Sequence, residues 1–403
     1  MAVSPFDSQI YRQLLCDTEA AALFSDEAEL RCMIQVEVAL AQVQGELGLI
    51  PAASAKAIRQ AAAKIEIDPA GLAAGTRRDG VPVPALVELM RSSVPSAEHA
   101  QYLHHGATSQ DIMDSALMLR LRDVCLIIED RLMRLLQALA RQAETHAELP
   151  LAARTRAQIA TPTSFGAVIA AWGAPLLSQL EALARLRPRL LRVSLAGASG
   201  NSAALGERAA ELRGALAAAL GLVDSEQPWH SDRTALAEFS SLCTRVGASL
   251  ARVGEDYIEA SRPEVGEILI TAGGGSSTMP QKKNPVEAEM LVSLFHFAAA
   301  MDGLMTLGML HRQQRDGVAW SLEWHALPQV CMATARALQL ALELVENLQP
   351  DADAMQARLS EGQGLVYAEA ISFRLAEIMP RPQAQARVKQ MCSEAIDQKV
   401  SLA

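Results

Sequence analysis

The sequence predicts an all-α protein built around a long central helical bundle. Apolar residues recur at helical spacing along most of the chain, as they do at Leu30, Met33, Ile34, Val38 and Ala41. Runs in which β-branched and polar residues alternate are nearly absent, so we expect no sheet of consequence. Half of the residues are apolar but only 4% are aromatic, which indicates an aliphatic core between long packed helices.

Long helical patterns occupy the middle of the chain. Upstream of them, Ser25 is expected to cap a helix that ends before Pro51. We expect an N-terminal helical domain over 1–105, a central bundle over 106–350 and a short C-terminal helical domain over 351–403. The segment from Val286 to Leu310 is apolar around much of its circumference, which predicts a bundle centre or a subunit interface. The central helices are predicted over about 110–146, 163–187, 203–220, 232–263, 285–315 and 325–348.

Charge and composition exclude several classes of protein. The net charge of −10 argues against nucleic acid or an anionic membrane as a general partner. The N-terminus has no signal-peptide pattern, and polar or charged residues interrupt the longest apolar runs. Six cysteines without C-x-x-C spacing are typical of reduced, mostly buried thiols in a cytoplasmic protein. No pair of histidines has metal-ligand spacing with a carboxylate, so we expect no metal.

Three loops combine hydroxyl groups with positions just before a helix. They are HHGATSQD (104–111), RTRAQIATPTS (154–164) and GGGSSTMPQKKNP (273–285). The second predicts Thr161 as N-cap and Pro162 at the first helical position, and the third predicts Asn284 as N-cap. Free N–H groups at such helix starts attract anions, and Arg154, Arg156, Lys282 and Lys283 add full charges.

The glycine-rich loop carries the strongest chemical signal. Its three glycines suit a loop that closes over a ligand, although a flexible linker that happens to carry serine remains the alternative. A serine surrounded by N–H groups and lysine can have its alkoxide stabilised. Lys282 and Asn284 are placed to bind an anion and to stabilise developing negative charge.

The segment GSSTMPQKKNP resembles the signature of the fumarase/aspartase superfamily, with matches at Gly275, Ser276, Met279, Lys282 and Asn284. GATSQDIMD and RTRAQIATP resemble its two other signature regions, in the same order along the chain. Further segments, among them LHHGATSQDIMD, EQPWHSDR and WSLEWHALP, are similar to the superfamily's bacterial cycloisomerases of 3-carboxymuconate. The resemblance implies an all-helical subunit in a homotetramer whose active sites combine loops from three subunits.

The resemblance also implies the reaction and its residues. It implies lactone formation from a small polycarboxylate without any cofactor. It assigns catalytic roles to Ser276, His104 and Lys282, with Ser276 as base in the elimination direction and proton donor in lactone formation. It assigns substrate binding to Thr108, Ser109, Arg156, Gln158, Asn284, Arg315 and Arg78.

Departures from the superfamily pattern refine the expectation. Many lyases of the superfamily have histidine at the position of Arg156, and adenylosuccinate lyases have another at Arg78. A carboxylate needs no protonation to leave, so a cation at Arg156 favours lactone chemistry over elimination. Gln314 replaces the usual glutamate, and Asp316 would repel a polycarboxylate unless Arg312 or Arg315 pairs with it.

Two other functions remain open. One is a lyase that cleaves a C–N or C–O bond of another polycarboxylate and releases fumarate or an analogue. The other is a catalytically silent binding or structural protein on the same scaffold. His230, within PWHSDR, is either a site residue or a packing residue.

Overall fold

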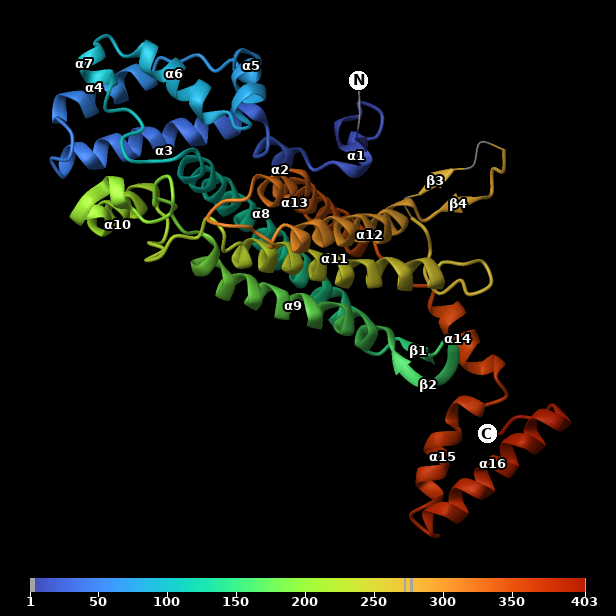
Figure 1. Cartoon of the computed structure of the whole chain (residues 1–403). Coiled ribbons are helices and arrows are strands. Elements are labelled where there is room, and N and C mark those ends of the chain that lie inside the picture. Colours follow the sequence, from blue (N-terminus) through green and yellow to red (C-terminus); the bar gives the residue numbers. More distant parts are fainter. Residues whose placement is uncertain (1–3, 272, 276–277, 403) are drawn as a thin grey trace. The chain divides into compact units, whose positions relative to one another are not determined.

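The computed structural model describes residues 4–271, 273–275 and 278–402. It confirms the all-α prediction, because helices make up most of the described chain (Figure 1). The α-helices are α1 (Arg12–Leu15), α2 (Thr18–Ala22), α3 (Asp26–Glu46), α4 (Ala52–Ala62), α5 (Pro69–Asp79), α6 (Val83–Ser93), α7 (Ala97–Ala100), α8 (Ser109–Thr145), α9 (Phe165–Leu190), α10 (Ala209–Leu220), α11 (Thr234–Ala260), α12 (Val286–Leu307), α13 (Gly317–Glu346), α14 (Ala352–Glu361), α15 (Ala368–Leu375) and α16 (Arg381–Gln398). The 3-10 helices are η1 (Pro5–Asp7), η2 (Ala203–Arg208) and η3 (Leu365–Tyr367), and the strands are β1 (Pro150–Thr155), β2 (Gln158–Ser164), β3 (Gly274–Gly275) and β4 (Lys283–Asn284).

The chain forms two compact units. Unit 1 comprises Met1–Arg131, Gln179–Gly247 and Leu294–Arg336, and unit 2 comprises Leu132–Ser178, Ala248–Ser293 and Ala337–Ala403. Helices α8, α9, α11, α12 and α13 each contribute residues to both units. The three-domain division with boundaries near residues 105 and 350 stays a prediction.

The N-terminal helices of unit 1 begin and pack as their small residues dictate. The Ser25 hydroxyl accepts a hydrogen bond from the Ala28 N–H at 3.2 Å, which confirms the predicted cap of α3. Helices α3 and α4 approach closely, because a Cβ atom on Gly45 would lie 2.7 Å from the Cβ of Ala55. Glycine is therefore required at this crossing.

Three fully buried thiols lie in the bundle segments of unit 1. They are Cys125 on α8, Cys243 on α11 and Cys331 on α13. Burial raises the pKa of Cys125 to about 12 and raises the pKa of the other two thiols as well. All six cysteines are unpaired and four are buried, which confirms the prediction of mostly buried thiols.

The segment between α12 and α13 corrects two predicted helix ranges. The helix predicted over 285–315 ends at Leu307, and the helix predicted over 325–348 begins at Gly317. Asp316 is the reason for the early start, because its carboxylate accepts hydrogen bonds from the N–H groups of Val318 and Ala319 at 2.8 and 3.2 Å. Apolar periodicity alone could not reveal this cap.

The predicted helix starts near 163 and 203 are also corrected. Residues 150–164 form an antiparallel hairpin in which Pro162 faces Ala152, so Thr161 and Pro162 are strand residues. Helix α9 begins at Phe165 instead, where the Ser164 hydroxyl accepts a hydrogen bond from the Ala167 N–H at 3.2 Å. The segment from 203 begins as η2, and α10 follows from Ala209.

Two helices of the described chain have the length and composition of a membrane span. They are α9 and α12, with mean hydropathies of 1.3 and 1.5. Only 28% and 22% of these apolar windows are buried within the chain. Core helices of soluble proteins pass the same test, so length and composition alone assign no membrane location.

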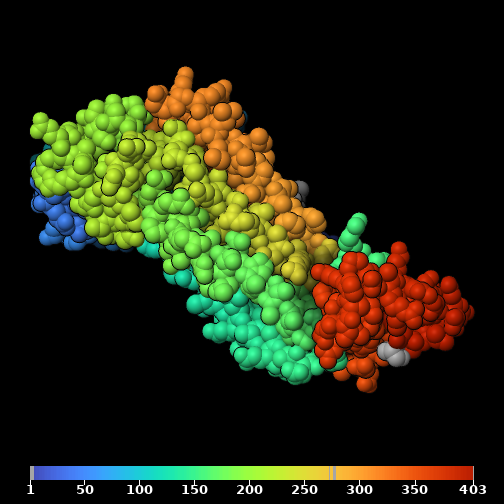
Figure 2. Space-filling model, turned by 90° about the horizontal axis from the view of Figure 1, so that it is seen from below, coloured from blue at the N-terminus to red at the C-terminus, as the bar shows by residue number. Residues whose placement is uncertain are grey.

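Part of the surface of α9 is covered by α11 within unit 1. The green surface of α9 adjoins the yellow-green surface of α11 in the space-filling view (Figure 2). Arg189 of α9 and Glu238 of α11 form an ion pair across this contact at 2.6 Å. Both side chains are exposed, so the pair adds little to stability.

Candidate active site

The first predicted loop lies in unit 1 and leads directly into α8. This helix begins at Ser109, as the sequence predicts within one residue. The Thr108 N–H donates to the Asp111 carboxylate at 3.1 Å, so the first turn of the helix caps itself. Thr108 and Ser109 are half-buried, and they stand where a helix start attracts negative charge.

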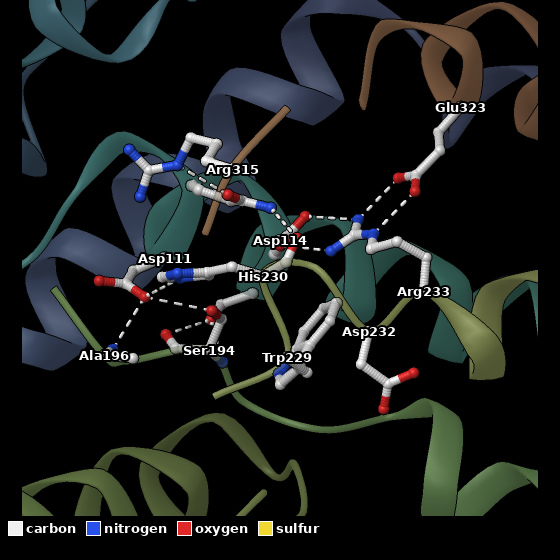
Figure 3. Close-up of polar contacts among 12 residues, drawn as sticks. Asp111, Asp114, Ser194, Ala196, Trp229, His230, Asp232, Arg233, Arg315 and Glu323 are labelled. Carbon is white, nitrogen blue, oxygen red and sulfur yellow. Dashed lines mark hydrogen bonds and ion pairs between the residues drawn. The ribbon is translucent and has the colours of Figure 1, made fainter. Parts of the chain in front are cut away.

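Asp111 ties this helix start to two other segments of unit 1. Its carboxylate is fully buried and accepts hydrogen bonds from a backbone turn and from a histidine (Figure 3). The donors are the Ser194 hydroxyl at 3.1 Å, the N–H groups of Ala196 and Gly197 at 2.9 Å, and His230 Nε2 at 2.8 Å. His230 is itself only 3% exposed, so it helps to hold the helix start from within.

Arg315 reaches the same helix start from the segment before α13. Its Nε donates to the Gln110 side-chain oxygen at 2.8 Å, and one of its terminal nitrogens donates to the Ala198 carbonyl at 3.2 Å. The structure therefore brings Arg315 together with Thr108 and Ser109, three residues that the sequence predicts for substrate binding.

His104 is oriented by a buried carboxylate. Its Nδ1 lies 2.6 Å from Glu37 Oε1, and Glu37 is fully buried. This contact favours a proton on Nδ1, which leaves Nε2 as the ring atom available to a ligand. His104 has a φ of 64°, an uncommon conformation for a non-glycine residue, which the Glu37 contact helps to hold.

Arg78 lies on the exposed last turn of α5. Its guanidinium forms a bidentate contact with the neighbouring Asp79, at 2.9 and 2.8 Å. Hydrogen bonding to Asp79 raises the pKa of Arg78 and lowers the pKa of Asp79. Part of the positive charge of Arg78 is thus compensated within α5.

The negative charge of Asp316 is paired with Arg312, one of the two partners that the sequence analysis names. Its carboxylate accepts a hydrogen bond from the Arg312 guanidinium, in addition to its cap contacts with α13. The hydrogen bond from Arg312 is the largest cause that lowers the pKa of Asp316 well below its usual range. Asp316 therefore serves the start of α13, and its negative charge is paired.

A buried ion triad lies next to this site, and sequence reasoning missed it. The Arg233 guanidinium binds Asp114 at 2.7 and 2.9 Å and Glu323 at 2.7 and 2.6 Å (Figure 3). The ring of Trp229 lies 4.9 Å from the Arg233 carbon Cζ. Asp114 and Glu323 stand in segments that resemble the family, but no local pattern reveals that they pair with Arg233.

The second predicted loop forms the turn of the β1–β2 hairpin in unit 2. Thr155 pairs with Gln158, so Arg156 and Ala157 make a two-residue turn. Both adopt positive φ, 51° and 61°, which is the backbone of a type I′ turn normally built from glycine or asparagine. Arg156 and Gln158 are both exposed at this turn.

Arg154 anchors the same hairpin. Its guanidinium binds Glu267 through two hydrogen bonds of 2.7 and 2.8 Å, and Glu267 is 1% exposed. Hydrogen bonding to Glu267 raises the pKa of Arg154. Arg154 is thus occupied in holding the strand, while Arg156 stands two residues further at the turn.

The third predicted loop is partly described. Gly274 pairs with Asn284, and Gly275 pairs with Lys283. Helix α12 begins at Val286, so its N-cap is Pro285, one residue later than predicted. Ser276 lies outside the described residues.

Close packing accounts for part of the glycine content of this loop. A Cβ atom on Gly273 would lie 2.6 Å from the Asn284 carbonyl oxygen, a distance that no side chain tolerates.

Lys282 is exposed and lines an open cavity of about 870 Å³ together with Lys283, Met279 and Gln281.

The predicted site residues thus fall into two sets. Unit 1 carries His104, Thr108, Ser109, Arg315 and Arg78, and unit 2 carries Arg156, Gln158, Lys282 and Asn284. Within the described part of the chain, no cluster of three or more histidine, cysteine, aspartate or glutamate side chains is arranged to hold a metal ion.

Comparisons with known proteins place the chain among enzymes with this motif set. The family described as Lyase matches residues 18–296. The chain is 40% identical to the 3-carboxy-cis,cis-muconate cycloisomerase of Pseudomonas aeruginosa, over 98% of this chain and 87% of that protein. It is 33% identical to the nitrosuccinate lyase of Streptomyces davaonensis, over 98% of this chain and 86% of that protein.

A solved structure supports the same relationship. The 3-carboxy-cis,cis-muconate lactonizing enzyme of Pseudomonas putida superposes with a TM-score of 0.90 at 35% sequence identity. The superposition covers 98% of this chain and 89% of that one.

Proposed function

Because this chain belongs to the fumarase/aspartase superfamily, we propose that it interconverts 3-carboxy-cis,cis-muconate and 4-carboxymuconolactone. The observation that carries the proposal is the near full-length similarity to cycloisomerases of this substrate, at 40% identity and at a TM-score of 0.90. The enzyme is an intramolecular lyase of the protocatechuate branch of aromatic degradation. Its substrate is a small polycarboxylate.

The reaction explains why an acidic protein collects cations in a few loops. One substrate carboxylate forms a C–O bond to a carbon of the conjugated diene, and a proton is added alpha to another carboxylate. The intermediate between these steps is an enediolate with two negative charges on its reacting carboxylate. Cations and N–H donors aimed at that group lower the barrier. The reaction transfers only a proton and a carboxylate, so the proposal includes neither a cofactor nor a metal.

The unit 1 set is proposed to bind substrate carboxylates. The hydroxyls and N–H groups of Thr108 and Ser109 are proposed to bind one carboxylate, and Arg315 is proposed to add a full positive charge beside them. The orientation of His104 by Glu37 supports a catalytic role for its Nε2 atom. Arg78 is proposed to contact substrate as well.

The residues of the unit 2 set are also proposed to bind and act on substrate. Lys282 and Asn284 are proposed to bind the reacting carboxylate, with Lys282 stabilising the enediolate and Ser276 donating the proton. Gln158 and Arg156 are proposed to contact substrate from the hairpin turn. Arg156 is proposed to bind the carboxylate that is the nucleophile in lactone formation and the leaving group in the reverse reaction. A carboxylate leaves without protonation, so this position needs a cation and no general acid.

We further propose a cytoplasmic homotetramer with active sites shared between subunits. Support comes from α12, which is apolar around much of its surface while only 22% of its apolar window is buried within the chain. A second copy of the chain that covered this face would remove its apolar side chains from water. The proposal includes no nucleic acid and no membrane partner.

A direct assay tests the proposed reaction. Incubation with 3-carboxy-cis,cis-muconate is expected to abolish the diene absorbance as the lactone forms. Replacing Ser276→Ala is expected to remove turnover while the helical circular dichroism stays unchanged. Retained turnover in this variant would exclude Ser276 from proton transfer.

The lyase alternative is favoured by one specific observation, the 33% identity to a nitrosuccinate lyase over nearly the whole chain. Under that alternative the protein leaves the muconate diene intact and releases fumarate or an analogue from a substituted succinate. Nitrosuccinate and other substituted succinates are the substrates to test. Inertness toward both groups of substrates would favour a silent scaffold.

A further inference from the structure

Gln110 occupies an unusual place among the residues at the start of α8. Its side chain is fully buried and uses both ends of its amide. The nitrogen donates to the His230 carbonyl at 2.9 Å, and the oxygen accepts from Arg315 Nε at 2.8 Å. A buried amide satisfied at both ends is fixed in position, because releasing either bond would leave a polar group unpaired.

Arg315 differs from the other arginines around the site in the partners that hold it. Arg78, Arg233 and Arg312 each bind a carboxylate, which compensates their charge. Arg315 is held through the Gln110 amide and the Ala198 carbonyl, and within the described residues its hydrogen bonds go to these two neutral groups. A neutral acceptor fixes a guanidinium in place without neutralising it.

The position of Gln110 matters because Arg315 is long and only partly buried. A free arginine side chain loses about 2 kcal/mol of rotamer entropy when a ligand orders it. Anchoring its Nε in advance removes much of this cost, and it places the terminal nitrogens for a bidentate contact with a carboxylate.

We propose that Gln110 is a positioning residue that holds Arg315 in place, and leaves it fully charged, for binding a substrate carboxylate. The residue acts through Arg315 and does not contact the reacting atoms. This inference rests on the proposed function, in which Arg315 binds substrate.

Two variants of Gln110 separate anchoring from charge. Gln110→Met keeps the size of the side chain but removes the acceptor. Gln110→Glu keeps an acceptor beside Arg315 but adds a negative charge, and both variants lose the bond to the His230 carbonyl. We expect KM for 3-carboxy-cis,cis-muconate to rise about tenfold in Gln110→Met. In Gln110→Glu we expect a larger rise, with kcat changed less than KM in both.

Ser115→Ala is the matched control. Ser115 is also fully buried on α8, and its hydroxyl bonds the backbone of Ser194 at 3.0 and 2.9 Å without touching Arg315. We expect this variant to lower the melting temperature about as much as Gln110→Met while leaving KM unchanged. Equal KM values in the Gln110 and Ser115 variants would overturn the inference.

Arg315→Met distinguishes a failure of this inference from a failure of the proposed function. If Arg315→Met leaves KM unchanged, Arg315 does not bind substrate and the proposed role of Arg315 is wrong. If Arg315→Met raises KM but the Gln110 variants do not, only the positioning role of Gln110 is wrong. In the Arg315→Met background, Gln110→Glu is expected to have no further effect on KM, because the two residues act through one contact.

Discussion

The first turn of α8 and the turn of the β1–β2 hairpin hold their candidate site residues in opposite ways. At α8, the buried side chains of Gln110 and Asp111 bind the helix start to three other segments. At the hairpin, Arg156 is exposed on a two-residue turn with positive φ, and the anchor Arg154 lies two residues away. We therefore expect substitutions at the start of α8 to change stability together with the proposed substrate contact, and substitutions at the hairpin turn to change the proposed contact alone.

The largest expected effect is a loss of stability when the buried ion triad of unit 1 is broken. Replacing Arg233→Met would leave Asp114 and Glu323 buried without their common partner. Removing one partner of a buried ion pair costs about 3–5 kcal/mol of unfolding free energy. Urea unfolding followed by circular dichroism measures this loss. A variant as stable as the native chain would show that the triad does not support unit 1.

The second prediction tests the hairpin turn, where activity is expected to change without stability. Arg156 has a backbone φ of 51° and an exposed side chain, so Arg156→Met removes a positive charge without removing a buried contact. We expect kcat/KM for 3-carboxy-cis,cis-muconate to fall about tenfold to a hundredfold, because a charge-assisted contact with a substrate carboxylate, worth about 1.5–3 kcal/mol, is lost. The melting temperature is expected to stay the same. A joint loss of activity and stability would contradict the separation of the two at this turn.

The third prediction uses the lowered pKa of Asp316. A carboxyl group whose pKa is lower in the folded state stabilises the protein above its unfolded pKa of about 3.9. This stabilisation is lost as the pH falls from there through the folded pKa. We therefore expect Asp316→Asn to unfold at a lower urea concentration than the native chain at pH 7. The difference should shrink steadily below about pH 4. A difference that is constant with pH would assign the effect to the amide itself.

The smallest expected effect is a small gain in stability at the hairpin turn. Replacing Ala157→Gly relieves a positive φ of 61° at an exposed position. The gain in unfolding free energy is expected to be about 0.5–1 kcal/mol, with kcat/KM unchanged. Thermal unfolding and the diene assay measure both quantities. A loss of activity would mean that the strain in the turn serves substrate contact.

The helices were predictable from sequence because their signal is local. Apolar periodicity revealed the long central helices, and Ser25 revealed the start of α3. The hairpin at 150–164 carries no alternating pattern. One of its supports is the pair between Arg154 and Glu267, which lie 113 residues apart in the chain. No local pattern reports such a partner.

The candidate site shows the same limit. Resemblance to the family named Thr108, Ser109 and Arg315, and the structure brings these three residues together in unit 1. It could not name Glu37, which lies 67 residues from His104, or the oxygen of Gln110, which lies 205 residues from Arg315. The predicted site residues lie in short sequence motifs that can be recognised locally. The residues that position them are distant in the chain, and only the folded structure reveals them.

The three fully buried thiols of unit 1 can report local unfolding of its helical core. Cys125, Cys243 and Cys331 are fully buried on three different helices, and their raised pKa values keep them as unreactive thiols. A thiol reagent can modify them only when the helices separate. The rate of their modification therefore measures how often the core of unit 1 unfolds locally, and no label has to be introduced.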